Sequence, residues 1–432
     1  MSMTSGARPA PRLGAWLTSV ALSAILSAWP AAAQTPPATL SMTEALSRAA
    51  AFDPSRAAID ARVAAGEAAI RQAGVKPNPS LGLELENFAG SGAYSMLDRT
   101  EATVSYQQTL ERGGKREART GLARAQLEVA GLRGAARALD FLQDVEIAYA
   151  EALAAEADLL IAEARLVAVL TAQSDVDRRV KSARDPLFAG SRAEAIVAQA
   201  EIARDEARLA ASATRSSLAS YWGGSGDFKL ELKAFFEVAT PALPATSVTS
   251  PDLQLIAAER DVAAAAVRVE QARATTDPTL RAGVRYLGDG GDLAFVLGGT
   301  IPLHRYDTNR AGVERAQAER TAAEVDLEAA RLARERQIAR LIIKLSASAR
   351  EAERIRTEVI PANIRTVEQV RAGFNRGGFE FSDVAEAEKA LFDIRARRVA
   401  VLKQHHLDQA ALDRLTGIHA GLLPQITRAE TR

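Results

Sequence analysis

The chain has 432 residues and carries 54 basic and 54 acidic side chains, so its formal net charge is zero. This balance excludes the basic excess that a nucleic-acid-binding protein would show. Aromatic residues make up only 5% of the chain, and alanine, arginine and glutamate dominate its helical stretches, which is typical of long helices with narrow packing seams. The chain contains no cysteine, which excludes disulfide bonds and a lipid anchor on an N-terminal cysteine.

The N-terminal region has the pattern of a secretory signal peptide. Arg8 and Arg12 precede an apolar stretch over residues 13–29, and three alanines at 31–33 provide a cleavage site before Gln34. An uncleaved anchor helix is the alternative, but the small-residue exit and the proline-bearing segment after it favour cleavage. The mature sequence has no window of eighteen uninterrupted apolar residues, so any membrane span would have to be made of strands closed into a barrel.

The second half of the chain repeats the first. A Gln-Ala pair followed by Pro-Ser-Leu within residues 72–81 returns 199 residues later as Gln-Ala and Pro-Thr-Leu within residues 271–280. An Arg-Ala-Gln-x-Glu motif at 124–128 returns at 315–319. A period of about 195 residues is too long for a solenoid repeat, so we predict two copies of one larger unit.

The predicted elements follow the same order in both halves. The first half is predicted to form a helix capped by Ser41 and Glu44, a second helix to about residue 73, strands at 80–86 and 103–110, a helix at 115–181, a turn at 184–190 and a helix at 191–222. The second half is predicted to form a helix at 251–275, strands at 280–286 and 293–301, a helix at 309–374 with a kink at Pro361, and a helix at 382–415. The domains are then a signal peptide at 1–33, repeats at 34–222 (hairpin about 79–110) and 251–416 (hairpin about 278–303), a linker at 223–250 and a tail at 417–432.

The fold class is therefore mainly α with a small β part, as a duplicated helix–β-hairpin–long-helix unit. Each strand alternates an apolar face with a polar one, and Glu84, Glu86, Arg281 and Arg285 fall on the polar face. Charges at these positions suit a wet barrel lumen and not lipid. Four strands are too few to close a barrel, which predicts that several protomers share one. The alternative is a soluble helical bundle capped by two hairpins. This alternative does not explain why both hairpins lie between such long helices.

The segment at 106–119 resembles the strand-to-helix junction of TolC-type outer-membrane efflux channels. Its Q-x-x-E-x-G-G-K-R pattern is most similar to the heavy-metal (cobalt-zinc-cadmium type) cation efflux branch. Residues 300–303 resemble the matching junction of the second half, and residues 377–388 resemble the segment before the last helix. The resemblance covers nearly the whole mature chain.

The resemblance implies a homotrimer located in the outer membrane and extending into the periplasm. Each protomer would give four strands to a twelve-stranded barrel in outer-membrane lipid and four helical columns to a periplasmic tunnel. The linker and the tail would form an equatorial belt. The turns at 184–190 and 376–382 would form the periplasmic tip, which would meet a periplasmic adaptor (membrane fusion protein) and, through it, an inner-membrane pump of the resistance–nodulation–division type.

Candidate gate residues lie near the predicted tip turns. The resemblance implies that Asp383 and Glu386, which share a helix face, line the lumen as carboxylate rings that attract cations. Helix capping is the alternative, because acidic side chains stabilise a helix N-terminus. The arginines near the tip could tie neighbouring helices together or remain solvated helix ends; they are Arg376, Arg371 and Arg184. Asp383 and Glu386 align with Arg192 and Ala195 of the first repeat, and this asymmetry suggests where a gate would lie.

The sequence predicts no enzyme, cofactor or resident metal site. His405 and His406 are adjacent in a helix and point about 100° apart, so they would not chelate one ion together. Lys115 and Arg116 follow two glycines but lack the spacing of a phosphate-binding loop. We therefore expect a passive conduit for metal cations or drugs. The alternatives are the outer-membrane duct of a type I protein-secretion system and a soluble periplasmic coiled-coil adaptor or scaffold.

Overall fold

A computed structural model describes residues 39–95, 97–238 and 250–422. The predicted signal peptide, part of the linker and the end of the tail lie outside the described residues. The α-helices are α1 (Met42–Phe52), α2 (Arg56–Ala73), α3 (Lys115–Lys181), α4 (Leu187–Ser220), α5 (Leu232–Phe236), α6 (Pro251–Arg273), α7 (Arg310–Arg354), α8 (Ile360–Arg376) and α9 (Phe381–Thr416). There is also a π-helical turn, η3 (Ile355–Val359), and there are 3₁₀ turns η1 (Gly92–Tyr94), η2 (Leu97–Arg99) and η4 (Ile418–Leu422). The strands are β1 (Thr39–Leu40), β2 (Ser80–Glu86), β3 (Glu101–Thr109), β4 (Lys229–Leu230), β5 (Thr279–Leu287) and β6 (Asp292–Thr300).

The longest element is α3, whose 67 residues contain no proline and have the predicted bounds. At about 1.5 Å of rise per residue, such a helix extends about 100 Å. Gly134 allows α2 to approach it closely, because a Cβ atom at this position would lie 2.7 Å from Cγ2 of Ile59. A larger side chain here would push the two helices apart.

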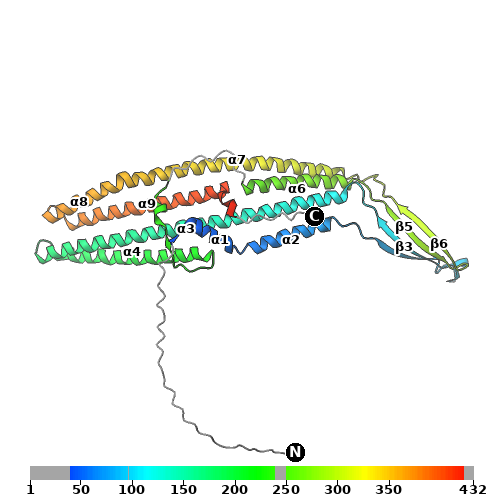
Figure 1. Cartoon of the computed structure of the whole chain (residues 1–432), viewed down its shortest axis with the longest axis horizontal. Helices are drawn as coiled ribbons and strands as arrows, with labels where there is room; N and C mark the ends of the chain where they lie inside the picture. Colours follow the sequence, from blue (N-terminus) through cyan, green and yellow to red (C-terminus); the bar gives the residue numbers. More distant parts are fainter. Residues whose placement is uncertain (1–38, 96, 239–249, 423–432) are drawn as a thin grey trace, which may run out of the picture. The chain divides into compact units, whose positions relative to one another are not determined.

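The helices pack side by side along narrow seams (Figure 1). The central helix α3 contacts α2, α4, α6 and α9, while α7 packs on α6 and α9, and α8 packs on α9. The largest buried cluster brings together Leu142 and Val145 of α3, Leu402 of α9 and Phe235 of α5. In the parts of the chain that the structure describes, no helix has both the length and the apolar character that a membrane crossing requires.

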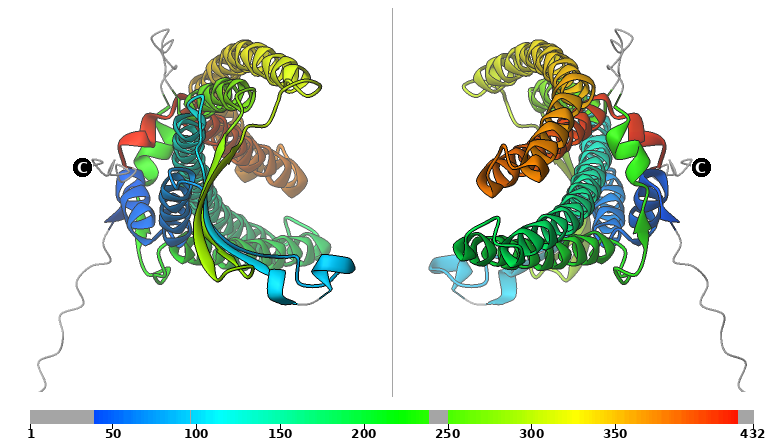
Figure 2. Two further views of the ribbon diagram at one scale, coloured as in Figure 1. Left: turned by 90° about the vertical axis from the view of Figure 1, so that its right-hand side faces the viewer. Right: turned by 90° about the vertical axis from the view of Figure 1, so that its left-hand side faces the viewer.

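The four long strands form one antiparallel sheet in the order β2-β3-β5-β6. The left view of Figure 2 shows the strands running side by side along a curve. β3 and β5 join the hairpins of the two halves, with Val104 opposite Val284. On either side, Leu83 of β2 faces Val104 and Phe295 of β6 faces Val284. Because α2, α3, α6 and α7 pack together and each connects to one strand, the two repeats combine into a single sheet.

Some element bounds differ from the sequence predictions. The turn predicted at 184–190 is shorter, because α4 begins at Leu187 immediately after Pro186, whose extended backbone forms the N-cap. The predicted kink at Pro361 takes the form of the π-helical turn η3 just before α8. Proline has no N–H to donate and clashes with the carbonyl four residues earlier, so a locally wider turn relieves this conflict. The second strand begins earlier than predicted, at Glu101, and the fourth ends at Thr300, before Ile301.

Candidate functional site

One face of the four-stranded sheet carries a connected polar network around Arg285. Its guanidinium contacts Glu86 at 2.9 Å and Glu101 at 2.7 Å, and its Nε donates to Oγ1 of Thr103 at 2.9 Å. Arg281, four residues earlier on β5, pairs with Glu84 at 3.5 Å. The four charged residues predicted for a common polar face, Glu84, Glu86, Arg281 and Arg285, therefore lie together on it. Opposite charges pair across three strands, with three carboxylates against two guanidiniums, which keeps this face polar with one more negative than positive charge.

Glu101 and Thr103 belong to the same network, but only Thr103 lay within the predicted strand. Extending the period-two alternation of β3 backward by two residues places Glu101 on the polar face, so the signal was present in the sequence. Thr103 is only 1% exposed, because β2 and β5 flank it and Arg285 covers it.

The opposite face of the sheet is apolar and exposed. Phe295 is 94% exposed and Leu297 is 85% exposed on β6, while Leu83 on β2 is 71% exposed. Val104 and Val284 continue this face across the two central strands. A contiguous apolar surface of this kind marks a region that contacts lipid or another protein.

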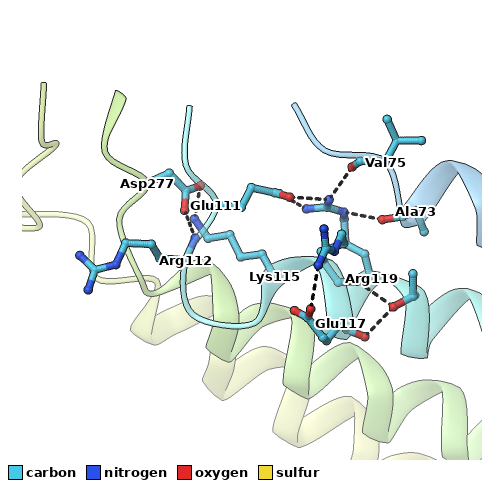
Figure 3. A network of polar contacts seen from close by, with 10 residues as sticks. Ala73, Val75, Glu111, Arg112, Lys115, Glu117, Arg119 and Asp277 are labelled. Carbon is cyan, nitrogen blue, oxygen red and sulfur yellow. Dashed lines mark hydrogen bonds and ion pairs between the residues drawn. The ribbon is translucent and has the colours of Figure 1, made fainter. Parts of the chain in front are cut away.

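A second polar network holds the junction between strands and helices (Figure 3). Nζ of Lys115 lies 2.5 Å from Oδ2 of Asp277, whose other oxygen accepts a hydrogen bond from the backbone N–H of Arg112 at 2.9 Å. Burial opposes ionisation of Asp277, but these two hydrogen bonds outweigh it and lower the pKa of the carboxyl. Arg119 pairs with both oxygens of Glu111. The junction therefore joins β3 and α3 of the first repeat to the segment just before β5 in the second repeat.

Two glycines shape the turn at this junction. Gly113 and Gly114 have φ values of +69° and +70°, in the left-handed region that favours glycine. A Cβ atom on Gly113 would lie 2.4 Å from Oγ1 of Thr275, so the position also requires close approach to the second repeat. This geometry explains the Gly-Gly before Lys115 and agrees with a structural role for Lys115 and Arg116.

Arg179 links the two helix pairs where α3–α4 and α8–α9 turn. It makes two 2.8 Å hydrogen bonds to Asp185 in the α3–α4 turn. It also donates to the backbone carbonyl of Phe374 on α8 at 2.5 Å, and its guanidinium lies 4.3 Å from the centre of that ring. The sequence did not predict a role for Arg179, because a contact between positions 195 residues apart leaves no local pattern.

Arg371, one of the predicted tip arginines, binds a buried carboxylate. Its Nε and Nη2 lie 2.8 and 2.5 Å from Oε1 of Glu388, which is 3% exposed. Burial raises the pKa of Glu388, and the hydrogen bond from Arg371 offsets part of that effect. This pair fastens α8 to α9 within one protomer.

Three of the other four tip candidates line two neighbouring hollows. Arg184 and Asp383 line one hollow, together with Arg179 and Asp185. Glu386 lines the second, and Arg192 lines both. Oδ2 of Asp383 accepts a hydrogen bond from the backbone N–H of Glu380 at 2.8 Å, which is a helix-capping contact. Arg376 lies in the last turn of α8, before Gly377 ends that helix with φ of +86°.

The histidine pair on α9 points to two different partners. Nδ1 of His405 lies 2.9 Å from Oγ of Ser348, whereas Nε2 of His406 lies 3.1 Å from the backbone carbonyl of Phe235. The two rings are perpendicular, with centroids 5.7 Å apart, as expected for neighbours that do not chelate one ion. Burial lowers the pKa of both imidazoles.

Potential metal ligands do come together elsewhere. Glu146 of α3, Asp413 of α9 and His419 of η4 each offer one ligand atom, and these atoms lie within 4.8 Å of one another. The sequence did not predict this group, because Glu146 is separated from His419 by 273 positions.

Comparison with known proteins identifies relatives across most of the chain. The sequence matches the outer membrane efflux protein family over residues 45–224 and 245–418. The cobalt-zinc-cadmium resistance protein CzcC of Cupriavidus metallidurans is 28% identical over 389 residues, which cover 88% of this chain and 90% of that protein. The nickel and cobalt resistance protein CnrC of the same organism is 31% identical over 319 residues, which cover 73% of each.

Solved structures share the fold. CusC aligns with a TM-score of 0.71 at 16% identity, covering 88% of this chain and 93% of that one. The outer membrane protein VceC of Vibrio cholerae aligns with a TM-score of 0.67 at 20% identity, covering 87% of this chain and 96% of that one. With its two matched segments covering most of the sequence, the chain belongs to the outer membrane efflux protein family.

Proposed function

We propose that three copies of this chain form the outer-membrane channel of a tripartite efflux pump. The two-faced sheet carries the proposal: its apolar face is exposed, and its opposite face holds paired charges. Four strands do not close a barrel, since about eight strands are needed for a filled interior. Three sheets would supply twelve strands, with the apolar faces toward lipid and the polar faces toward a wet lumen.

The long helices of the three chains would continue the barrel as a periplasmic tunnel. Exposed apolar side chains on the helices support this arrangement, among them Leu209 of α4 at 72% and Val325 of α7 at 62% exposure. Neighbouring protomers would cover such side chains. The α3–α4 and α8–α9 turns would then form the tip that meets a periplasmic adaptor and, through it, an inner-membrane pump of the resistance–nodulation–division type.

Metal cations are the proposed cargo. Two relatives support this choice. CzcC is named for resistance to cobalt, zinc and cadmium, and CnrC is named for resistance to nickel and cobalt. The channel itself would act without catalysis, as a passive conduit. We propose that Glu84, Glu86, Arg281 and Arg285 face the barrel lumen. At the tip, the proposed gate or lumen residues are Asp383, Glu386, Arg376, Arg371 and Arg184.

Deletion of the gene in its host tests the cargo. We expect lower tolerance of one or more of Co²⁺, Zn²⁺, Cd²⁺, Ni²⁺ and Cu²⁺, restored by re-expression of the wild-type chain. Sensitivity limited to organic antibiotics would overturn the metal assignment and leave the channel proposal standing. Unchanged tolerance with loss of a secreted protein would instead identify a type I secretion duct.

Fractionation of the same cells tests the channel itself. We expect the mature protein in outer membranes as a trimer that dissociates only on heating in detergent. A monomer in the soluble periplasmic fraction would contradict the channel and indicate the adaptor or scaffold alternative.

A further inference from the structure

Three side chains from distant parts of the sequence meet where α9 ends. Helix α9 ends at Thr416, and Gly417 adopts a φ of +68°, which redirects the chain into η4. His419 of η4 thereby returns to α3, where its Nε2 lies 2.6 Å from Oε1 of Glu146. Asp413, in the last turn of α9, completes the group, and the three ligand atoms lie within 4.8 Å of one another.

Glu146 is the member that requires a further partner. It is only 4% exposed, and among the residues that the structure describes its second oxygen, Oε2, is buried without a hydrogen-bond partner. A buried carboxylate oxygen left unpaired is destabilising, because it loses its hydrogen bonds to water without replacing them. The contact with His419 satisfies Oε1 alone. A simple Glu146–His419 ion pair therefore gives Oε2 no partner, and it does not account for a second carboxylate, Asp413, in the same group.

The neighbouring residues favour a preformed ligand set. Nε2 of Gln409, one helical turn before Asp413, donates to Oδ1 of Asp413 at 2.8 Å and so orients that carboxylate. Outer hydrogen bonds of this kind commonly fix metal-ligating side chains. His419 keeps 23% of its side chain exposed, so solvent reaches one member of the group.

We propose that Glu146, Asp413 and His419 bind a divalent transition-metal ion of the zinc or cobalt class. One imidazole and two carboxylates are suitable ligands for such ions, and water would complete the coordination. Ligand atoms about 2.0–2.2 Å from zinc lie roughly 3–4 Å apart. Binding would therefore move Nε2 of His419 and Oε1 of Glu146 slightly apart from their present 2.6 Å, within a group whose ligand atoms already lie within 4.8 Å of one another. The bound ion would fasten the end of α9 to α3. It would be a resident ion of the protein, distinct from exported cargo.

The purified full-length protein in detergent, stripped of metal with a chelator, provides the test. Titration with Co²⁺, followed by its visible absorption, and with Zn²⁺, followed by calorimetry, should reveal one site per chain. His419→Ala and Asp413→Asn should each weaken binding by about ten-fold or more. His304→Ala is the matched control and should bind as the wild type does, because His304 is exposed and outside the cluster.

Thermal unfolding supplies a second measurement. Zn²⁺ should raise the unfolding temperature of the wild type and of His304→Ala, and should raise that of His419→Ala much less. No binding by the wild type, or equal binding by wild type, His419→Ala and Asp413→Asn, would overturn the proposal. These measurements need no pump or export, so their failure would leave the proposed channel function untouched.

Discussion

Arg179 of α3 and Phe374 of α8 join the two helix pairs at their turns. Nη1 of Arg179 donates to the carbonyl oxygen of Phe374 at 2.5 Å, and the guanidinium lies 4.3 Å from the phenyl ring centre. Asp185 fixes the same guanidinium through two 2.8 Å hydrogen bonds. One planar cation thus holds the α3–α4 turn against α8, and it does so within a single protomer.

We predict that Arg179→Ala will loosen the tip and raise the conductance of the channel in planar bilayers. The substitution removes three hydrogen bonds from a guanidinium that is only 16% exposed. If the tie contributes about 1.4 kcal/mol to the closed state, its loss shifts the closed–open equilibrium about ten-fold. Arg178→Ala is the control, because Arg178 is 74% exposed and pairs with Asp175 of its own helix. Equal conductance of the two variants would contradict a role for Arg179 in closure.

Asp383 can be tested for a lumenal charge separately from helix capping. Asp383→Asn keeps a side-chain oxygen that can accept from the N–H of Glu380 but removes the negative charge. We predict lower cation preference for Asp383→Asn and for Glu386→Gln in bilayer recordings, with little change in unfolding temperature. Asp383→Ala should in addition lose about 0.5–1.5 kcal/mol of stability, because it removes the hydrogen bond that Asp383 accepts in the capping box with Glu380. Unchanged ion selectivity in Asp383→Asn would reduce this residue to a capping role.

The sequence predicts the regular elements of this protein better than the contacts between them. Helix α3 was predictable because 67 residues without proline leave no signal for a break, and the polar sheet face followed from strict alternation around Arg285. The contact of Arg179 with Phe374 was not predictable, since it depends on how two helix pairs pack. The same holds for the meeting of Glu146 with His419, which requires the left-handed turn after α9.

Acidification should destabilise the protein through its buried histidines. Burial lowers the pKa of His405 and His406 below 6.5, so the unfolded chain binds more protons than the folded one just below that pH. The stabilisation is present above pH 6.5 and is lost as the pH falls from 6.5 through the lowered folded-state pKa values. Each pKa unit by which folding lowers the value corresponds to about 1.4 kcal/mol of unfolding free energy.

His406→Gln provides the comparison for this pH dependence, because a glutamine amide can still donate to the carbonyl of Phe235. We predict that the wild type loses more unfolding free energy than His406→Gln between pH 7 and pH 5, measured by chemical denaturation. His304→Gln, at an exposed position, should follow the wild type. Parallel pH profiles for wild type and His406→Gln would show that His406 does not contribute to the loss of stability on acidification.

Two glycine substitutions should change stability in opposite directions. Gly113→Ala places a Cβ atom 2.4 Å from Oγ1 of Thr275 in a left-handed conformation, so we expect a loss of more than about 1 kcal/mol. Gly121→Ala lies within α3 with open space around its Cβ position, and it should gain about 0.5–1 kcal/mol. Thermal unfolding of both variants measures the difference. A stabilised Gly113→Ala protein would contradict the close junction between the repeats.

Cysteine labelling along β6 tests most directly whether the sheet is part of a water-filled barrel in lipid. The chain has no cysteine, so single cysteines can be introduced without background. In intact outer membranes, a water-soluble maleimide should label cysteines at Ala294 and Val296, on the polar face, and spare those at Leu293, Phe295 and Leu297, on the apolar face. Strong labelling on the apolar face, where Phe295 is 94% exposed in one protomer, would mean that this face meets water and would contradict the barrel.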